Sequence, residues 1–463
     1  MSGKAVIGLE IHVQLKTKTK MFCSCLNDMS SPANSNICPI CLGLPGSLPV
    51  LNKAGLKQGL KLALALKCNI NKESFFYRKH YFYPDLPKGY QITQSRTPLG
   101  TGGCILLNGG KKIRIRGIHI EEESGKLMHE GDKTLIDFNR AGIPLAEIVS
   151  EPDIETPEQA AEFVEKLQLI LQYLDISNAR MEKGELRCEP NISITEEDGK
   201  LGTRCEIKNL NSIKNLRDGI RKEVSRQEKL IKEGKVIQQF TLLWDESTRD
   251  VKIMRKKETA ADYRYMPEPD IPPLVVDDGF INSVKKDIGE LPDERIDRFV
   301  KQGLSKEEAG IIVSNKKLAD IFETTIDEGM EAKESYSWIQ NVFLGALRMW
   351  KKEIDEIDIK DFIEIMKKYR RNLLTSTNAK IAIQRIVKGE ALTDFVKELE
   401  ISMSIDLNSI IEEVLNKYQE EVKRYKEGKK GLLGFFIGQV MKKTKGKINP
   451  NEAKEVLIKK LHT

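Results

Sequence analysis

A chain of 463 residues is long enough for two to four domains, each with its own hydrophobic core. Charged residues make up 31% of it and hydrophobic residues 40%, and neither an apolar run of 18 residues nor a signal peptide occurs, so we expect a cytoplasmic protein without a membrane span. The formal net charge of +6 permits a nucleic-acid partner without requiring one.

The first predicted element is a strand at residues 5–15 in which apolar and polar residues alternate. The apolar residues share one face, and Glu10 and His12 lie about 7 Å apart on the other. A carboxylate and an imidazole can hold a metal ion between them, or one can act as a base that the other orients. A solvated polar face is the alternative that this pattern alone favours.

Four cysteines follow in two close pairs, Cys23 with Cys25 and Cys38 with Cys41. Four thiolates at these spacings fit a tetrahedral Zn²⁺ that holds a loop with little core of its own. The first pair is closer than the usual CxxC, and free thiols are the alternative. The other four cysteines are isolated, and we expect them to be small core residues.

Residues 77–94 crowd tyrosines and a phenylalanine among Lys, Arg and His, around two prolines. The prolines are incompatible with a continuous helix or a central strand across the segment. Aromatic rings interleaved with cations suit stacking on bases or sugars and contact with phosphates. A surface loop whose tyrosines support a sheet edge is the alternative.

A second acidic group lies near the end of the strand predicted at residues 104–122. A change of parity at Arg116 and Gly117 predicts a bulge, after which Glu122 falls on the apolar face, between Glu121 and Glu123 on the polar face. A carboxylate on the buried side needs a partner, which a metal ion or a cation would supply. Fraying of the strand end into solvent is the alternative.

Strands are also predicted at residues 133–149, 185–194 and 202–208. The last two carry alternating acids and bases on one face, among them Glu185, Arg187 and Glu206. Such residues can simply pair across strands. If the faces line a common concavity, they could instead hold Mg²⁺ and nucleotide phosphates.

Two helices interrupt the strands. One has Thr156 as its N-cap, Pro157 at its first position and Gln159 completing a capping box, and the other runs from Ser212 to Gly234. Residues 267–273, PEPDIPP, predict a rigid extended connector. Beyond residue 292 strand signals vanish, and helices are predicted at 306–329, 336–354, 359–374 and 377–389.

A basic patch marks the end of the chain, because residues 423–447 carry nine Lys or Arg and a single Glu. The predicted fold class is therefore α+β: a mainly antiparallel sheet domain at 1–292, an all-α helical domain at 293–398 and a helical tail domain at 399–463. Phosphate-binding loops of the Walker or Rossmann type and a Gly-x-Ser-x-Gly elbow are absent from the sequence.

Taken together, these segments resemble the B subunit of the bacterial-type aspartyl/glutamyl-tRNA amidotransferase over essentially the whole chain. The resemblance rests on the motifs VIGLEIHVQL, NSNICPICLGLPGSLPVLN, RKHYFYPDLPKGYQITQ, HIEEESGKLMHE, LIDFNRAGIPLAEIVSEPDI, MEKGELRCEPNISI, EIKNLNSIKNLR and DYRYMPEPDIPPL.

The resemblance implies a cradle-shaped first domain and an ATP-dependent reaction. ATP would phosphorylate the side chain of Glu (or Asp) mischarged on tRNA(Gln) (or tRNA(Asn)). Ammonia, released from glutamine by a separate amidase A subunit and channelled to the site, would displace the phosphate to give Gln-tRNA(Gln) or Asn-tRNA(Asn). A small C subunit would complete a heterotrimer.

The resemblance also implies roles for individual residues. Glu10, His12 and Glu122 match the catalytic Mg²⁺ cluster of the family, and the four cysteines match its structural zinc loop. Lys79, Tyr81, Tyr83 and Lys88 fall in a segment that lines the same site. With them, the candidates for contact with ATP or substrate are Glu121, Glu185, Arg187 and Glu206. The tail lysines that match a tRNA-binding domain are Lys429, Lys430, Lys442, Lys443 and Lys445.

Two other functions use part of the same pattern. A zinc-bearing RNA-binding protein without catalysis would use the cysteines, the aromatic segment and the tail, and would leave the carboxylates idle. A free-standing metal hydrolase would use Glu10, His12 and Glu122, and would need neither ATP nor partners.

Overall fold

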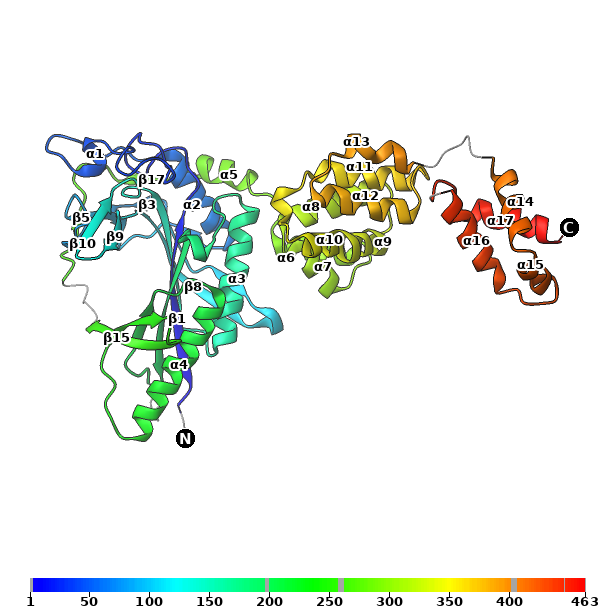
Figure 1. The fold of residues 1–463 in the computed structure, drawn as a ribbon. Coiled ribbons are helices and arrows are strands. Elements are labelled where there is room, and N and C mark those ends of the chain that lie inside the picture. Colours follow the sequence, from blue (N-terminus) through cyan, green and yellow to red (C-terminus); the bar gives the residue numbers. More distant parts are fainter. Residues whose placement is uncertain (1–2, 196–199, 257–261, 401–405, 445, 463) are drawn as a thin grey trace. The chain divides into compact units, whose positions relative to one another are not determined.

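The computed structural model describes residues 3–195, 200–256, 262–400, 406–444 and 446–462. The chain divides into two units, Met1–Pro292 and Asp293–Thr463 (Figure 1). Within the described ranges, no helix has both the length and the apolar character needed to cross a membrane. The predicted α+β class is confirmed, with an antiparallel-dominated sheet in the first unit and helices in the second.

A large sheet forms the first unit. Its hydrogen-bonded path runs β15-β14-β13-β12-β1-β11-β8-β5-β4-β16, and the pairs along it are antiparallel except for β13 with β14. The strands of this unit are β1 (Ala5–Gln14), β2 (Asn69–Ile70), β3 (Glu73–Ser74), β4 (Phe76–His80), β5 (Tyr90–Gln94), β6 (Gly100–Thr101), β7 (Cys104–Leu106), β8 (Lys112–Glu122), β9 (Lys126–Glu130), β10 (Lys133–Asp137), β11 (Pro144–Ser150), β12 (Leu186–Ile194), β13 (Cys205–Lys208), β14 (Phe240–Asp245), β15 (Asp250–Lys256), β16 (Met266–Pro267) and β17 (Leu274–Val275).

Helices cover the apolar face of this sheet. Apolar residues of β1 are buried in one core with residues of α2, α3 and α4, and Figure 1 shows α3 and α4 along the sheet. Gly59 in α2 allows close packing, because a Cβ there would lie 2.2 Å from the Ile120 side chain. The opposite face of the sheet is left open for polar residues. The helices of this unit are α1 (Pro39–Leu42), α2 (Lys53–Ala65), α3 (Pro157–Tyr173), η2 (Met181–Lys183), α4 (Ile213–Lys232) and α5 (Asp278–Lys286), with a short turn η1 (Asn108–Gly110).

Both predicted helices of this unit are confirmed, with one correction at α3. The Thr156 side chain accepts a hydrogen bond from the Gln159 N–H, but the Gln159 side chain accepts from Glu155 N–H, so the reciprocal bond of a capping box is displaced by one residue. Ser212 caps α4. The helices α2 and α5, which Asn52 and Asp277 cap, were not predicted from the sequence.

The predicted bulge in β8 is confirmed, and it determines which residues face the open side of the sheet. Val149 pairs with Gly117 and Ser150 pairs with Ile115, so Arg116 is the extra residue. After it, Ile120 and Glu122 lie on the core side and Glu121 on the open side. The predicted strands 104–122 and 133–149 are each divided in two, at η1 and at residues 138–143.

Residues 267–273 are not a connector between domains. β16 pairs with β4 and β17 with β3, so the segment returns to the first unit. Glu268 in this segment is buried and forms an ion pair with Arg78 at 2.8 Å. The prolines of this segment are tolerated because its two strands are short, so few of its backbone N–H groups are required for strand pairing.

The second unit is helical. The predicted helix 306–329 is two helices, because the Asn315 side chain accepts hydrogen bonds from Lys317 and Leu318 N–H and starts α8. The predicted helix 336–354 is interrupted by a π turn. Residues 407–461 have a hydrophobic cluster of their own, while the predicted boundary at residue 398 stays a prediction. The helices are α6 (Pro292–Lys301), α7 (Lys306–Val313), α8 (Lys316–Asp327), α9 (Ala332–Ser337), η3 (Trp338–Phe343), α10 (Leu344–Trp350), η4 (Ile354–Glu356), α11 (Ile359–Arg370), α12 (Ser376–Lys388), α13 (Leu392–Leu399), α14 (Leu407–Lys417), α15 (Gln419–Lys426), α16 (Leu432–Lys443) and α17 (Pro450–His462).

Candidate active site

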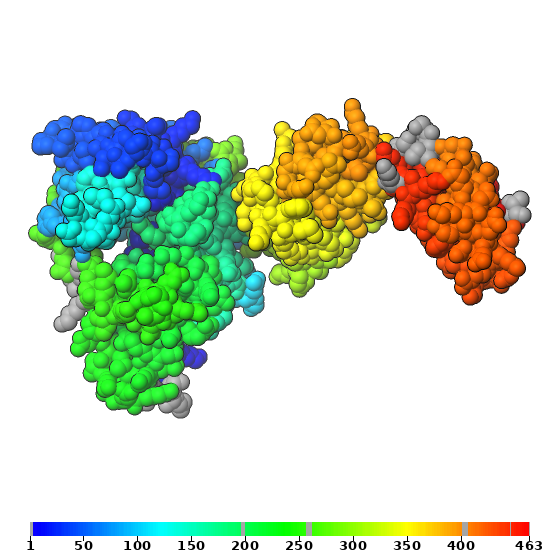
Figure 2. Space-filling view, viewed as in Figure 1, coloured from blue at the N-terminus to red at the C-terminus, as the bar shows by residue number. Residues whose placement is uncertain are grey.

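A polar pocket lies on the open face of the sheet. Side chains alternate along β1, so Glu10 and His12 point away from the covering helices, and the neighbouring strands add polar residues on the same side. Figure 2 shows a recess in this unit between its blue-to-cyan and its green parts. The pocket, called here the acidic pocket, has a volume of about 420 Å³ and is lined by Glu10, His12, Lys79, Tyr81, Gln91, Glu121, Glu123, Ser124, Leu145, Glu147, Arg187, Glu189, Glu206, Lys208, Thr241, Arg255, Tyr263 and Tyr265.

Glu10, His12 and Glu147 form a cluster in this pocket that fits a divalent cation. β1 pairs with β11 so that His12 is opposite Glu147. One ligand atom from each of the three residues lies within 4.8 Å of the other two. Ligands about 2.1 Å from an octahedral Mg²⁺ lie about 3 Å apart when adjacent and about 4.2 Å when opposite, so small adjustments would complete such a site.

A further carboxylate, that of Glu121, lies beside this cluster. Its Oε1 lies 3.2 Å from Nε2 of His12, which would orient the imidazole for metal binding. Burial disfavours a charge on His12, but the hydrogen bond to Glu121 and the surrounding carboxylates outweigh it and raise the pKa of His12. Burial, and then repulsion from Glu121, raise the pKa of Glu147. The carboxylates create a negative potential that favours bound protons on His12 and Glu147, and a divalent cation would offset this potential in their place.

Cations surround this negative centre. Arg187 pairs with Glu123 at 2.6 Å, and Lys208 pairs with Glu189 at 2.6 Å. Lys79 Nζ lies 4.8 Å from the ring centroid of Tyr263. The acids and bases of β12 and β13 therefore form ion pairs and also line a common pocket. The sequence had left open whether they would do the one or the other. Pairs of this kind can exchange partners with the charged oxygens of a phosphate.

The structure brings most of the predicted substrate-site residues together, but not all of them. Tyr83 lines an adjoining pocket of about 220 Å³, which shares Lys79 and Tyr81 with the acidic pocket. Glu185 lies outside both, in an ion pair with Arg180 at 2.5 Å. The predicted candidates that line the acidic pocket itself are Lys79, Tyr81, Glu121, Arg187 and Glu206.

Glu122 is separated from Glu10 and His12, which corrects the expected cluster. It lies on the core side of β8, where its carboxylate accepts a hydrogen bond from Ile92 N–H at 2.9 Å and forms an ion pair with Lys88. Its partner is thus a cation, one of the two possibilities that strand parity left open. Lys88 is directed to the same side and does not line the acidic pocket.

Replacing Lys88 by methionine is expected to lower the free energy of unfolding by about 3 kcal/mol, because the Glu122 carboxylate would remain buried without its cation. Urea unfolding of the full chain would measure this. Lys72→Met removes an exposed ion pair with Asp278 and should change stability by less than about 1 kcal/mol. Equal effects of the two substitutions would contradict the structural role of Lys88.

The aromatic segment 77–94 forms an antiparallel hairpin of β4 and β5 with a loop between them. Tyr83 and Phe82 are exposed in this loop. The guanidinium of Arg78 lies over the Tyr90 ring at 4.4 Å. Tyr81 and Tyr83 line pockets, so this part of the segment is more than a support for the sheet edge.

Several pocket residues were missed by the sequence analysis. Glu147 is a single carboxylate in the apolar strand PLAEIVS, on the same parity as Leu145 and Val149, and this could have marked it as a candidate. Tyr263 and Tyr265 belong to the motif DYRYMPEPDIPPL, but no local pattern connects them to β1.

The four predicted zinc ligands are brought together in the loop that follows β1. The sulfur atoms of Cys23, Cys25, Cys38 and Cys41 lie within 4.8 Å of one another. Four sulfurs bound to one Zn²⁺ at about 2.3 Å lie about 3.8 Å apart, so the residues present fit this ion. A hydrogen bond from Cys23, and with it the charge of the fully buried Lys20, lowers the pKa of Cys41.

The predicted tail lysines lie around α15 and α16. Lys429 and Lys442 are exposed. Lys430 Nζ lies over the Tyr425 ring at 4.4 Å, and Lys443 pairs with Glu413. Lys445 lies outside the described residues.

Comparison with known proteins covers nearly the whole chain. Residues 5–282 match a family model described as the GatB/GatE catalytic domain, and residues 320–461 match one described as the GatB domain. The chain is 46% identical to the B subunit of the aspartyl/glutamyl-tRNA(Asn/Gln) amidotransferase of Thermosipho melanesiensis, with 98% of both chains covered. It is 43% identical to the protein of the same name from Thermodesulfovibrio yellowstonii, with 99% of both covered. The chain therefore belongs to the family of aspartyl/glutamyl-tRNA(Asn/Gln) amidotransferase B subunits.

Proposed function

We propose that this chain carries the site at which ATP activates the side-chain carboxylate of Glu (or Asp) on mischarged tRNA, and at which ammonia then replaces the phosphate. The observation that supports this most directly is the cluster of Glu10, His12 and Glu147 in a pocket that also holds Lys79 and Arg187. A negative centre ringed by cations suits a nucleotide triphosphate with its divalent ion and an acidic substrate.

The reaction has two steps. A carboxylate oxygen of the substrate attacks the γ-phosphorus of ATP, and ADP leaves, which gives an acyl phosphate. Ammonia then attacks the acyl carbon, the C–O bond to phosphate breaks, and the new nitrogen loses a proton to a base. Mg²⁺, when bound, would supply positive charge that offsets the charge of the phosphates.

The residues of the chain would hold the reactants in place. Glu10, His12 and Glu147 would hold the divalent ion, with Glu121 orienting His12. Lys79 and Arg187 would contact the transferred phosphoryl group or the substrate carboxylate. The acyl phosphate hydrolyses readily, so the reaction would require that water be kept from the site. Zn²⁺ on the four cysteines would have a structural role in the adjacent loop.

The partners follow from the same reaction. The ammonia requires a glutamine-hydrolysing amidase A subunit, and the family name denotes one subunit of a larger enzyme. We assign a small C subunit as the third member of a heterotrimer. Because mischarged tRNA is the substrate, the protein would act in the cytoplasm, on Glu-tRNA(Gln) and, where the cell supplies it, on Asp-tRNA(Asn).

The tail lysines are expected to contribute phosphate contacts to tRNA. Replacing Lys429, Lys430, Lys442 and Lys443 together by glutamine should weaken tRNA binding and reduce the slope of log K against log salt by about one unit for each lysine that touches a phosphate. Filter binding at several salt concentrations would measure both. Replacing Lys72 and Lys229, which are exposed elsewhere in the chain, should leave the slope unchanged. A wild-type slope in the tail variant would remove the tail from tRNA binding.

The test of the function is ATP-dependent conversion of Glu-tRNA(Gln) to Gln-tRNA(Gln) by the assembled heterotrimer. Conversion that needs both ATP and glutamine supports the proposal. Binding of tRNA without ATP consumption would favour the RNA-binding protein instead. Hydrolysis by the chain alone, without ATP or partners, would favour the metal hydrolase.

A further inference from the structure

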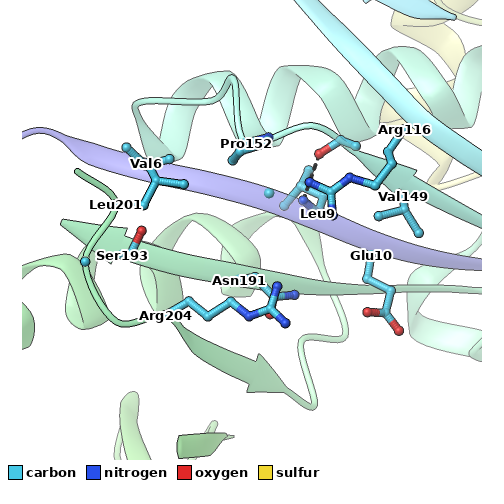
Figure 3. A pocket seen from close by; sticks show the side chains of 13 residues that line it. Val6, Leu9, Glu10, Arg116, Val149, Pro152, Asn191, Ser193, Leu201 and Arg204 are labelled. Atoms are coloured by element: carbon cyan, nitrogen blue, oxygen red, sulfur yellow. Dashed lines mark hydrogen bonds between the residues drawn. The ribbon is translucent and has the colours of Figure 1, made fainter. Parts of the chain in front are cut away.

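A second pocket adjoins the acidic pocket and shares Glu10 with it (Figure 3). This pocket, called here the side slot, has a volume of about 360 Å³. It follows β1 from Glu10 back to Val6, on the same open face of the sheet. Four residues of strand span about 13 Å, so the slot extends the acidic pocket along β1 by about that distance.

The floor of the side slot is bare backbone. Gly8 lies between Val6 and Glu10, and a Cβ built on it would be 3.8 Å from its nearest neighbours, in Ser150 and Pro152. The position would therefore accept a side chain without a clash, yet glycine leaves the slot open. A glycine within a strand is typical of a place where a ligand approaches the backbone closely.

The walls combine apolar surface with a few polar groups. Val149, Pro152 and Leu201 line the slot. Ser193 is only 6% exposed, lines the slot, and makes no side-chain hydrogen bond within the described residues. Figure 3 shows the Ser193 hydroxyl directed into the slot beside Val6. A hydroxyl that faces a largely apolar slot is suited to a ligand that offers it a hydrogen bond.

Two arginines border the slot on either side of β1. Arg116 is held by Glu151 at 2.9 Å. Arg204 has no ion-pair partner within the described ranges, and Figure 3 shows its guanidinium extending toward the Glu10 end. An unpaired guanidinium beside the acidic pocket would bind an anionic group that passes between the two pockets.

From these features we infer that the side slot binds the adenosine part of ATP, with the triphosphate passing Arg204 and Glu10 into the acidic pocket. The inference rests on the proposed function. The apolar walls would contact the two faces of the purine ring over Gly8, and Ser193 would hydrogen-bond a polar edge of the base or the ribose. The slot thus lets one ligand present its base at one end and its terminal phosphates to the metal cluster at the other.

The terminal adenosine of tRNA is a different ligand with the same base, and the structure offers it a different surface. The pocket that contains Tyr81, Tyr83 and Tyr263 combines aromatic rings with Lys79 and Arg255. Aromatic rings among cations, one of them the exposed Tyr83, are typical of surfaces that bind single-stranded nucleic acid. The side slot, with no aromatic residue in its lining, lacks such a stacking platform.

The experiment compares Mg-ATP and inorganic tripolyphosphate binding to the heterotrimer by calorimetry. Gly8→Leu fills the slot and should weaken Mg-ATP binding by about tenfold or more, because the base loses its place. Tripolyphosphate has no base, so its affinity should stay within about twofold of the wild-type value. Gly289→Leu is the matched control, since this exposed glycine has no atom within 4 Å of a built Cβ.

Ser193→Ala provides a second measurement if Gly8→Leu does not fold. It should weaken Mg-ATP binding about fivefold and leave tripolyphosphate unaffected. Wild-type affinity of both variants for Mg-ATP would overturn the inference and leave the proposed function intact. If the variants bind Glu-tRNA(Gln) more weakly but bind Mg-ATP normally, the inference is wrong and the side slot binds the terminal adenosine of tRNA instead. A wild-type complex that binds tRNA but no Mg-ATP would refute the proposed function itself.

Discussion

Replacing Glu147 by glutamine is expected to lower the rate of ATP-dependent Gln-tRNA formation by about 10²-fold or more. The substitution keeps the size of the side chain but removes one of the two carboxylates, Glu10 and Glu147, that could bind the ion together with His12. Mg²⁺ and similar divalent ions are bound mainly by oxygen ligands, and carboxylates contribute most to their affinity. Single-turnover kinetics would measure the rate, and Mn²⁺ titration followed by electron paramagnetic resonance would measure the metal affinity directly.

Two other glutamates serve as comparisons. Glu185→Gln lies outside the acidic pocket, in a pair with Arg180, and should retain the wild-type rate. Glu122→Gln should lower the stability of the chain through the loss of its pair with Lys88, while Mn²⁺ affinity stays at the wild-type value. If Glu122→Gln loses the metal and Glu147→Gln keeps it, the resemblance identifies the cluster correctly and the geometry does not. Binding of tRNA should be unchanged in all three variants.

Replacing Cys38 and Cys41 together by serine is expected to remove bound zinc and to destabilise the first unit by several kcal/mol, on the order of the contribution that structural zinc makes in small sites. Within residues 15–52, the only helix or strand that the structure describes is the short α1. Hydrogen bonds join this loop to residues 136–142, for example from Asn36 N–H to Asn139, and bound zinc would add to them. Elemental analysis would measure the zinc content, and thermal unfolding the stability.

Cys104→Ser is the matched control, because Cys104 is one of the isolated cysteines and is not part of the cluster. It should retain one zinc per chain and change stability by less than about 1 kcal/mol. A wild-type protein that contains no zinc, and whose unfolding temperature is unchanged by a chelator, would eliminate the zinc site.

The features that the sequence predicted correctly depend on residues that lie close together along the chain. The alternation in β1 placed Glu10 and His12 on the polar face, and the bulge at Arg116 followed from a change of parity within a few residues. The capped ends of α3 and α4 and the spacing of the four cysteines are equally local. Long motifs, read as a family resemblance, supplied the function that these local patterns alone left open.

The choice among the three consecutive glutamates shows where sequence reasoning was insufficient. Strand parity correctly put Glu122 on the core side and Glu121 on the other, but the motif HIEEES does not say which of them meets His12. The resemblance assigned Glu122 to the metal cluster, although parity placed it on the face opposite to Glu10. The cation that satisfies Glu122 is Lys88, whose side chain comes from the loop between β4 and β5.

The sequence by itself determined the class of the fold, the two faces of β1 and the cysteine quartet, because each of these depends on residues that are neighbours along the chain. Only the tertiary structure decided that Glu147 joins Glu10 and His12, that Glu122 belongs to Lys88, and that the side slot opens beside Glu10. The first and last of these placements depend on strand pairings between segments more than 100 residues apart, such as His12 with Glu147 and with Arg187. The second depends on a contact between Glu122 and Lys88, which are 34 residues apart. A one-residue change of register would turn each of these side chains to the opposite face, so no local pattern specifies them.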